Sequence, residues 1–408
     1  MPAIDFDLHG LLGIRLLDAT PREADAVAQQ LGSSPTALTG APDIVVRWIE
    51  RFPTSSLRVI GDHEAGYDHD AFFLLRGKDQ ARCRVQIPFE SIGGHQATRP
   101  GGVPGRCEIV CERGVSGVPL LVPIINLTLL GKGIVPIHAS AFVYQGRGVL
   151  AAGWSKGGKT EALLSFMARG AEYVADDWVY LTPERRLYGI AEPIRLRAWH
   201  LDELPQFRRR VPLLARARLR ALDLADRWKD ALPRRSRLLP TRFIGRVLHL
   251  LARQAFVTVP PRELFEPQVA APPAPFDHLF LLASHESSDV RIEPVDPTEV
   301  ARQMVFSVQE ERDRFLSYYR KFRFAFPGRA NPLIDESERL QRELLIKALA
   351  GTPAHAVFHP YPVRIPSLFD HMHGLIEAGE WQVDLSTRAI EPFVTGRQSS
   401  PRLAPLET

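Results

Sequence analysis

The sequence contains little cysteine and gives no sign of a disulfide framework. Its three cysteines, an odd and sparse number, predict reduced thiols. Cys107 and Cys111 flank three residues of an expected strand, and because no second pair of ligands stands near them, a zinc site is not predicted. The first ten residues are acidic and lack a basic stretch before an apolar core. This pattern predicts no secretory signal and a cytoplasmic protein.

Long hydrophobic runs are also missing. The longest apolar run, Val118 to Leu130, has 13 residues and includes Asn126 and Thr128. A membrane-spanning helix needs about 20 apolar residues. We therefore expect a buried helix here and no transmembrane segment. The overall composition, with 45% apolar and 24% charged residues over 408 positions, is that of a globular protein with room for two domains.

Charge is distributed unevenly along the chain. Residues 208–253 contain 14 Lys or Arg and 3 Asp, a local balance of +11, which leaves −7 for the rest of a chain whose net charge is +4. A basic segment on an acidic body predicts an anionic partner, which leaves nucleic acid, an anionic membrane surface and an acidic peptide open. Few aromatic side chains lie in this segment, so no specific nucleic-acid partner is expected. A solvated helical face is the simpler alternative.

Three regions follow one another along the sequence, and the second contains an insertion. Residues 1–115 show several short strand patterns and a helix that Thr20 would cap, and they predict an N-terminal α+β domain. Residues 116–394 predict a larger α/β domain, into which residues 204–254 insert a basic helical segment. The polar, proline-containing residues 395–408 predict a disordered tail.

A glycine-rich motif stands at residues 153–160, within the larger predicted domain. The motif fits G-x-x-x-x-G-K-[ST] at every position and consists of Gly153, Trp154, Ser155, Lys156, Gly157, Gly158, Lys159 and Thr160. Glycines let several backbone N–H groups face phosphate oxygens, the lysine reaches the outer phosphates, and the threonine hydroxyl offers Mg²⁺ a hard oxygen. A strand pattern precedes the motif and a helix pattern follows it, which is the order a phosphate loop needs. A Gly/Lys-rich surface turn is the alternative.

Two adjacent aspartates end the next expected strand. Asp176 and Asp177 follow the sequence EYVA, seventeen residues after Lys159. An acidic residue at the end of a strand beside a phosphate loop is well placed to reach the metal or the reacting hydroxyl. The alternative is that one aspartate only caps a turn.

Together these residues resemble the HPr kinase/phosphorylase family. Members carry a similar loop, then a glutamate, an Arg-Gly pair and an Ala-Asp-Asp sequence, which here are Glu161, Arg169-Gly170 and Ala175-Asp176-Asp177. The family also has a histidine fifteen residues before the first loop glycine, and His138 stands at that offset. The resemblance covers about residues 134–181.

This resemblance implies an α/β fold for residues 116–394, with a P-loop kinase core of the HPr kinase and phosphoenolpyruvate carboxykinase type. ATP and Mg²⁺ are the implied cofactors, with residues 153–161, Glu161 included, around the nucleotide. It implies Asp176 as the general base with His138 as its neighbour. Lys159 is expected to neutralise developing charge, and Thr160 and Asp177 to serve the metal.

Several of these residues have a structural alternative that the sequence leaves open. His138 lies in an apolar stretch typical of a core histidine, and Glu161 fits the first turn of a helix by its charge alone. Arg195 and Arg197 alternate along an expected strand, where they either face transferred phosphate or project into solvent.

Histidines near the end of the chain do not predict a metal site. His371 and His373 are two residues apart on an expected helix and therefore do not share a face. His355 and His359 lie on an expected strand just before Pro360, where they share one face only if the strand is regular.

The sequence thus predicts an ATP-dependent kinase that moves the γ-phosphoryl group to a hydroxyl, with a serine of a peptide or small protein as the expected acceptor. The basic segment suits an acidic acceptor. Two other functions keep the same residues: a nucleotide-binding regulatory module without transfer, and a kinase of a small-molecule hydroxyl. The sequence leaves homo-oligomerisation open.

Overall fold

A computed structural model describes most of the chain. The described residues are 2–52, 57–61, 65–69, 71–74, 84–94, 107–115, 117–231, 256–270 and 272–377, without the side chains of 225–231. Cys83, residues 232–254 of the predicted basic segment and the predicted tail at 395–408 lie outside the described residues.

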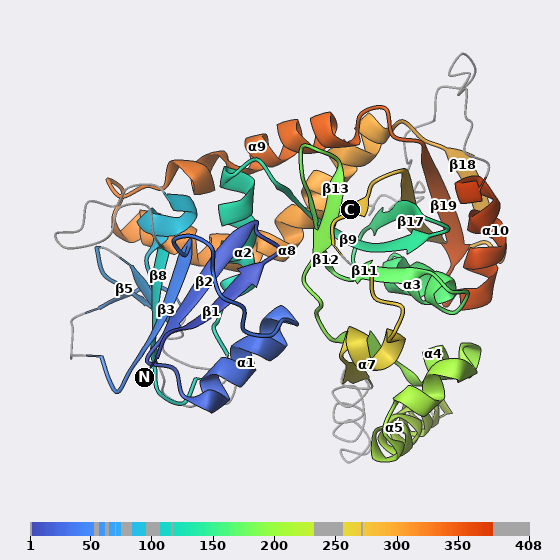
Figure 1. Cartoon of the computed structure of the whole chain (residues 1–408), viewed down its shortest axis with the longest axis horizontal. Coiled ribbons are helices and arrows are strands. Elements are labelled where there is room, and N and C mark those ends of the chain that lie inside the picture. Colours follow the sequence, from blue (N-terminus) through green and yellow to red (C-terminus); the bar gives the residue numbers. More distant parts are fainter. Residues whose placement is uncertain are drawn as a thin grey trace, which may run out of the picture.

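The N-terminal part of the chain forms an eight-stranded mixed sheet (Figure 1). The strand order is β1-β2-β3-β8-β7-β6-β5-β4, in which the neighbours β2, β3 and β8 run parallel and the other pairs antiparallel. The strands are β1 (Ile4–Leu8), β2 (Leu12–Leu17), β3 (Ile44–Ile49), β4 (Arg58–Val59), β5 (Ala65–Tyr67), β6 (Phe72–Leu74), β7 (Val85–Ile87) and β8 (Cys107–Glu112).

Helix α1 (Pro21–Leu31) begins as the sequence predicts. The Thr20 side chain accepts a hydrogen bond from the Glu23 backbone N–H, and the Glu23 carboxylate accepts one from the Thr20 N–H. This reciprocal pair satisfies two of the N–H groups that a helix start leaves without partners. Gly32 ends the helix in the left-handed region, at φ 57°.

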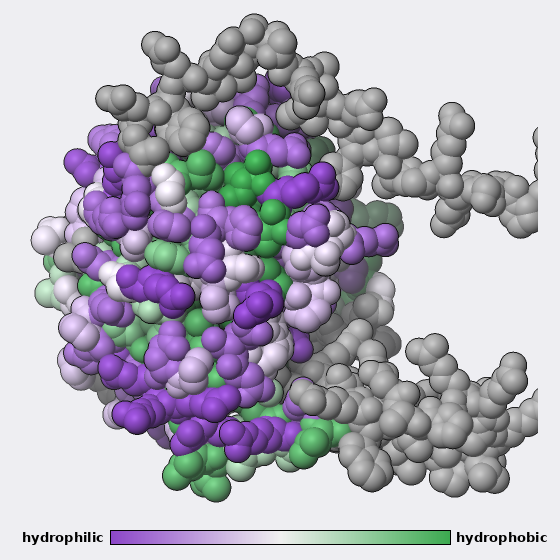
Figure 2. Space-filling view, turned by 90° about the vertical axis from the view of Figure 1, so that its right-hand side faces the viewer, coloured by the Kyte–Doolittle hydropathy of each residue, from purple (hydrophilic) through white to green (hydrophobic). Residues whose placement is uncertain are grey.

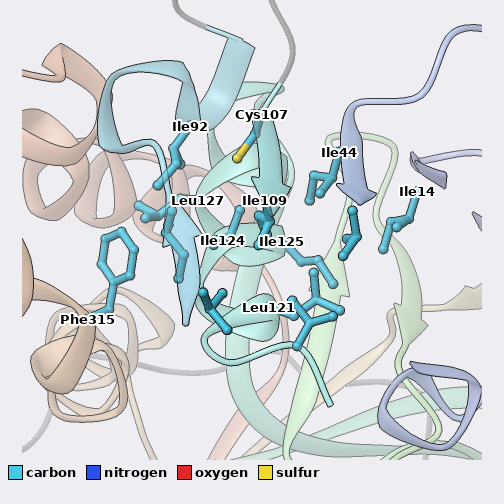
Figure 3. Packing of buried hydrophobic residues seen from close by; sticks show 14 of the residues in the cluster. Ile14, Ile44, Ile92, Cys107, Ile109, Leu121, Ile124, Ile125, Leu127 and Phe315 are labelled. Carbon is cyan, nitrogen blue, oxygen red and sulfur yellow. The ribbon is translucent and has the colours of Figure 1, made fainter. Parts of the chain in front are cut away.

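The apolar run of the sequence forms helix α2 (Leu121–Gly131), which is buried as predicted. Figure 3 shows Leu121, Ile124 and Ile125 of α2 facing side chains of the N-terminal sheet, among them Ile44 and Ile109. The two polar residues of the run do not disturb this packing. Asn126 accepts a hydrogen bond from the Tyr180 hydroxyl, and the Thr128 hydroxyl donates to a carbonyl one turn earlier.

A second, nine-stranded mixed sheet lies beside the first (Figure 1). Its order is β16-β13-β12-β9-β10-β17-β19-β18, with β11 also paired to β9, and β10, β17 and β19 are parallel. The strands are β9 (Val135–Tyr144), β10 (Arg147–Gly153), β11 (Glu172–Ala175), β12 (Trp178–Leu181), β13 (Arg186–Gly189), β16 (Ala274–Pro275), β17 (His278–His285), β18 (Arg291–Pro294) and β19 (Ala354–Pro360). A separate pair is formed by β14 (Ile194–Leu196) and β15 (Val257–Val259).

Helices cover both faces of the second sheet. Val149 and Ala151 of β10 pack with α3 and α10 on one face, while Leu150 and Ala152 pack with α8 and α9 on the other. Alternate residues of a strand point to opposite faces, so β10 is apolar from Val149 to Ala152. The remaining helices are α3 (Lys159–Met167), α4 (Ala198–Glu203), α5 (Leu213–Ala231), α7 (Pro261–Phe265), α8 (Pro297–Ala325), α9 (Pro332–Leu349) and α10 (Ile365–Glu377), with short 3₁₀ helices η1 (Phe89–Gly94) and η2 (Pro205–Arg210).

The long helix α8 joins the two sheets. Its first half packs on the second sheet through Val300 and Val305, and its second half completes the core of the N-terminal sheet through Phe315 and Phe322. Figure 1 shows α8 and α9 running along both sheets. The α/β class predicted from the sequence is confirmed, while the predicted domain boundary at residue 115 stays a prediction.

The described part of the basic segment is helical, as predicted, and lies at the lower end of the molecule in Figure 1. Leu213 and Leu214 at the start of α5 are 74% and 86% exposed. Figure 2 shows apolar side chains at this lower end. Arg218 and Arg220, further along α5, are also exposed. The segment therefore presents both leucines and arginines to solvent.

Candidate active site

The glycine-rich loop lies between β10 and α3, with the boundaries that the sequence predicts. Gly153 ends β10 and Lys159 begins α3. The loop follows the carboxyl end of β10, next to the parallel strands β17 and β19. A Cβ at Gly153 would lie 2.5 Å from the Leu282 carbonyl oxygen, and one at Gly158 would lie 2.3 Å from the imidazole of His359. Both positions therefore exclude a side chain.

Lys159 folds back into this loop and is 5% exposed. Its ammonium group donates hydrogen bonds to the carbonyl oxygens of Gly153, at 3.1 Å, and Trp154, at 2.8 Å. Burial lowers the pKa of Lys159, against the opposing effect of the carboxylates of Asp177 and Asp176. Both of these acceptors are neutral carbonyl oxygens, so an anion that enters the loop can replace them as the acceptor for the ammonium group.

Asp176 lies next to the start of α3 and is 5% exposed. The Thr160 hydroxyl donates to its carboxylate at 2.9 and 3.2 Å, and the Ser140 hydroxyl of β9 donates to it as well. Burial raises the pKa of Asp176 to about 7, the neighbouring Asp177 adds to the rise, and the two hydroxyls oppose it. The last residue of the loop motif and the first aspartate of the pair are therefore in direct contact.

Asp177 points elsewhere and is much more accessible. Its side chain is 39% exposed, its φ is 70°, and one carboxylate oxygen lies 3.7 Å from Nε2 of His138. Burial works against ionisation of Asp177, but His138, Arg195 and Lys159 together hold its pKa below the ordinary value. Adjacent residues with opposite pKa shifts are typical of sites where the environment separates two carboxyl groups.

His138 connects this pair to helix α8. The ring is 6% exposed, and its Nδ1 lies 3.3 Å from the Ser307 hydroxyl and 3.5 Å from the Glu311 carboxylate. The Ser307 hydroxyl also donates to the Gly153 carbonyl at 3.4 Å. Helix α8 thus contacts the loop directly and Asp177 through His138, a contribution that the sequence did not reveal.

Glu161, in the first turn of α3, pairs with a histidine from α4. Its carboxylate lies 3.2 Å from Nε2 of His200, whose Nδ1 accepts a hydrogen bond from the Arg197 N–H. This arrangement places the imidazole proton on Nε2, facing Glu161. Burial opposes ionisation of Glu161, yet the hydrogen bond from His200 keeps its pKa below the ordinary value.

Further charged groups surround the exposed aspartate. Burial, with a further contribution from the charge of Asp177, raises the pKa of Glu192 to about 7. Arg195 on β14 is exposed, and its guanidinium lies 5.8 Å from the ring centre of Phe256. Arg197 immediately precedes α4. The two arginines thus have different surroundings, although the sequence presents them as a pair.

No group of three or more His, Cys, Asp or Glu side chains is arranged to hold a metal ion within the described ranges. The hydroxyl of Thr160 and the carboxylate of Asp176 are hard oxygen donors, which is the chemistry that Mg²⁺ prefers. Two such donors suit an ion that takes its other ligands from phosphate oxygens and water. His371 and His373 instead lie against carbonyl oxygens of their own helix.

Comparison with known proteins adds no family to this description. No model of a known protein family matches the chain, and no curated protein matches it. Among the described residues, no helix combines the length and the apolar character needed to cross a bilayer.

Proposed function

We propose that the protein is an ATP-dependent phosphotransferase that moves the γ-phosphoryl group to a hydroxyl, with a serine of a peptide or small protein as acceptor. The observation that supports this proposal best is the contact between the Thr160 hydroxyl and Asp176, directly beside Asp177 and His138. This contact brings the loop, which has the residue types that bind phosphate, next to two carboxylates and an imidazole. The sequence resemblance to HPr kinases supports the same function.

Each residue has a role that its surroundings favour. Lys159 exchanges its carbonyl partners for phosphate oxygens and neutralises their charge. The N–H groups at the start of α3 add the positive end of the helix dipole. Thr160 and Asp176 would hold Mg²⁺, which when bound neutralises charge on the phosphates. Asp176 is too deeply buried to meet a hydroxyl on a peptide.

We infer that the more accessible carboxylate, Asp177, receives the hydroxyl proton and that His138 holds it in place. This reverses the roles that the family resemblance implies for the two aspartates. Accessibility supports this assignment, because a general base must come within hydrogen-bond reach of the proton that it takes. The raised pKa of Asp176 fits a site that a divalent cation enters, since a cation stabilises the ionised form.

The proposal is tested by incubating the full chain with γ-labelled ATP, Mg²⁺ and a library of serine-containing peptides. We expect label on peptide serine, and slow hydrolysis of ATP when no acceptor is present. Lys159→Ala abolishes both, whereas Lys347→Ala, which removes the same charge from an exposed position of α9, leaves both unchanged. Binding of ATP without transfer or hydrolysis would instead identify a regulatory nucleotide-binding module. Label on a small-molecule hydroxyl alone would change the acceptor class.

A further inference from the structure

His359 supports the glycine-rich loop from behind. It lies near the end of β19, is fully buried, and its Nε2 is 2.8 Å from the Gly157 carbonyl oxygen. The ring also occupies the space that a side chain at Gly158 would need. The contact joins parts of the chain 202 residues apart. Nothing in the chemistry proposed above uses this histidine.

Both ring nitrogens of His359 face carbonyl oxygens. Nδ1 lies 2.8 Å from the Pro360 carbonyl oxygen, in addition to the contact of Nε2 with Gly157. A carbonyl oxygen only accepts hydrogen bonds, so a proton on Nε2 makes the His359 ring the donor to Gly157.

The contact also fixes the direction of a backbone N–H. The peptide between Gly157 and Gly158 is trans, and in a trans peptide the C=O and the N–H point in opposite directions. Holding the carbonyl against His359 therefore turns the Gly158 N–H away from β19. Within the described part of the chain, no acceptor meets this N–H. A donor held in this way at the start of α3 is suited to a phosphate oxygen.

We propose that His359 is a positioning residue of the phosphate loop: its Nε2–H donates to the Gly157 carbonyl and thereby aims the Gly158 N–H at the bound phosphate. This role rests on the proposed function, because it presumes that the loop binds a nucleotide. It assigns to the end of β19 a part in nucleotide binding, separate from the transfer step.

The wild-type protein allows a test that needs no folded variant. In the full chain labelled with ¹⁵N-histidine, we expect the His359 ring to show a protonated Nε2, with the signal assigned by its loss in His359→Gln. A ring with an unprotonated Nε2 would overturn the proposal, because that nitrogen then has no proton to donate to Gly157.

Binding of Mg·ATP, measured by calorimetry, tests the consequence. We expect His359→Ala to bind about 10- to 100-fold more weakly than the wild type, as for a buried carbonyl that loses its hydrogen-bond donor. His359→Gln, which retains one donor, should recover part of the affinity. The matched control is His355→Ala, which removes a buried histidine from the same strand about 13 Å further along and should bind like the wild type.

The outcomes separate the two proposals. If the wild type binds Mg·ATP and His359→Ala binds it as tightly as His355→Ala does, the role of His359 is wrong and the proposed function stands. If the wild type binds no Mg·ATP, both fall. Thermal unfolding without nucleotide shows whether each variant is folded. Should His359→Ala not fold, the affinity of His359→Gln and the nitrogen signals of the wild type decide.

Discussion

The hydroxyl of Thr160 donates a hydrogen bond to the carboxylate of Asp176 at 2.9 Å, across sixteen residues of sequence. The two residues belong to different elements, since Thr160 stands in the first turn of α3 and Asp176 follows β11. The contact settles the direction in which Asp176 points. It leaves Asp177, on the other side of the backbone, to face His138 and solvent.

This division gives different predictions for the two aspartates. Asp177→Asn keeps the shape of the side chain and removes the group that receives the proton. We expect it to leave the affinity for ATP nearly intact while lowering phosphoryl transfer by a factor on the order of 10²–10⁴. Asp176→Asn should instead raise the Mg²⁺ concentration that binding and transfer need, because it removes a hard oxygen donor.

Transfer rates from labelled ATP and magnesium titrations by calorimetry provide the comparison. The two variants serve as controls for each other, since each replaces one carboxylate by an amide in adjacent positions. An effect of Asp176→Asn on transfer alone, with Asp177→Asn changing the Mg²⁺ requirement, would restore the roles implied by the family resemblance. Wild-type transfer in both variants would refute the kinase mechanism.

Glu192 makes the stability of the protein depend on pH. Its pKa is raised from an ordinary value of 4.5 to about 7, first by burial and then by Asp177. When a carboxyl group has a higher pKa in the folded than in the unfolded protein, it contributes to stability at pH values below the unfolded pKa. This contribution is lost as the pH rises through the folded pKa, here about 7. Glu192→Gln removes the loss, so at pH 8 the variant should be more stable than the wild type by on the order of 1–3 kcal/mol.

Urea unfolding at pH 5 and pH 8 measures this difference. We expect the advantage of Glu192→Gln to shrink at pH 5, where the wild-type carboxyl is mostly protonated. Glu184→Gln is the matched control, because Glu184 is exposed, and its stability relative to the wild type should not change between the two pH values. A constant gap for Glu192→Gln would show that Glu192 ionises freely in the folded protein.

Local patterns predicted much of the candidate site. The strand before the loop, the loop and the helix after it occupy the predicted residues, because Gly153 and Lys159 mark the change from strand to loop and from loop to helix. The sequence also placed Asp176 and Asp177 at the end of the next strand. These features depend on residues within about 30 positions of one another, where the periodicity of apolar residues carries the information.

Contacts between distant segments were not accessible in this way. Ser140 reaches Asp176 because β9 and β11 are neighbours, and Glu311 reaches His138 because α8 crosses the second sheet. His359 meets Gly157 only because β19 is placed parallel to β17. Strand order is decided by the packing of the whole chain, so no local pattern contains it. For the same reason, the sequence did not distinguish the buried aspartate from the exposed one.

The exposed arginines of α5 provide a prediction for the partner of the basic segment. Arg218→Glu combined with Arg220→Glu should weaken binding of an acidic peptide by about tenfold or more at low salt, and the difference should narrow at high salt as the charges are screened. Fluorescence anisotropy with a labelled acidic peptide measures the affinity of the wild type and the variant at each salt concentration. Arg22→Glu with Arg51→Glu makes the same charge change at exposed positions near the N-terminal sheet. Salt-independent binding would contradict an electrostatic partner site.

Glu311 offers a test of the contribution of α8 to the transfer step. Its carboxylate lies 3.5 Å from Nδ1 of His138, whose Nε2 faces Asp177 at 3.7 Å. A carboxylate on the far side of an imidazole fixes the orientation of the ring, and the ring in turn holds its other partner in place. Glu311→Gln should therefore lower the transfer rate by about 10- to 100-fold and leave the affinity for Mg·ATP unchanged.

Glu310→Gln is the matched control for this prediction, because it makes the same substitution at the adjacent, exposed position of α8. Single-turnover transfer from labelled ATP separates the rate of the chemical step from binding. We expect Glu310→Gln to transfer at the wild-type rate. His138→Gln should lower transfer at least as much as Glu311→Gln, and combining the two should add little, because the carboxylate acts through the imidazole. Independent, additive losses would mean that Glu311 acts on the site by a route other than His138.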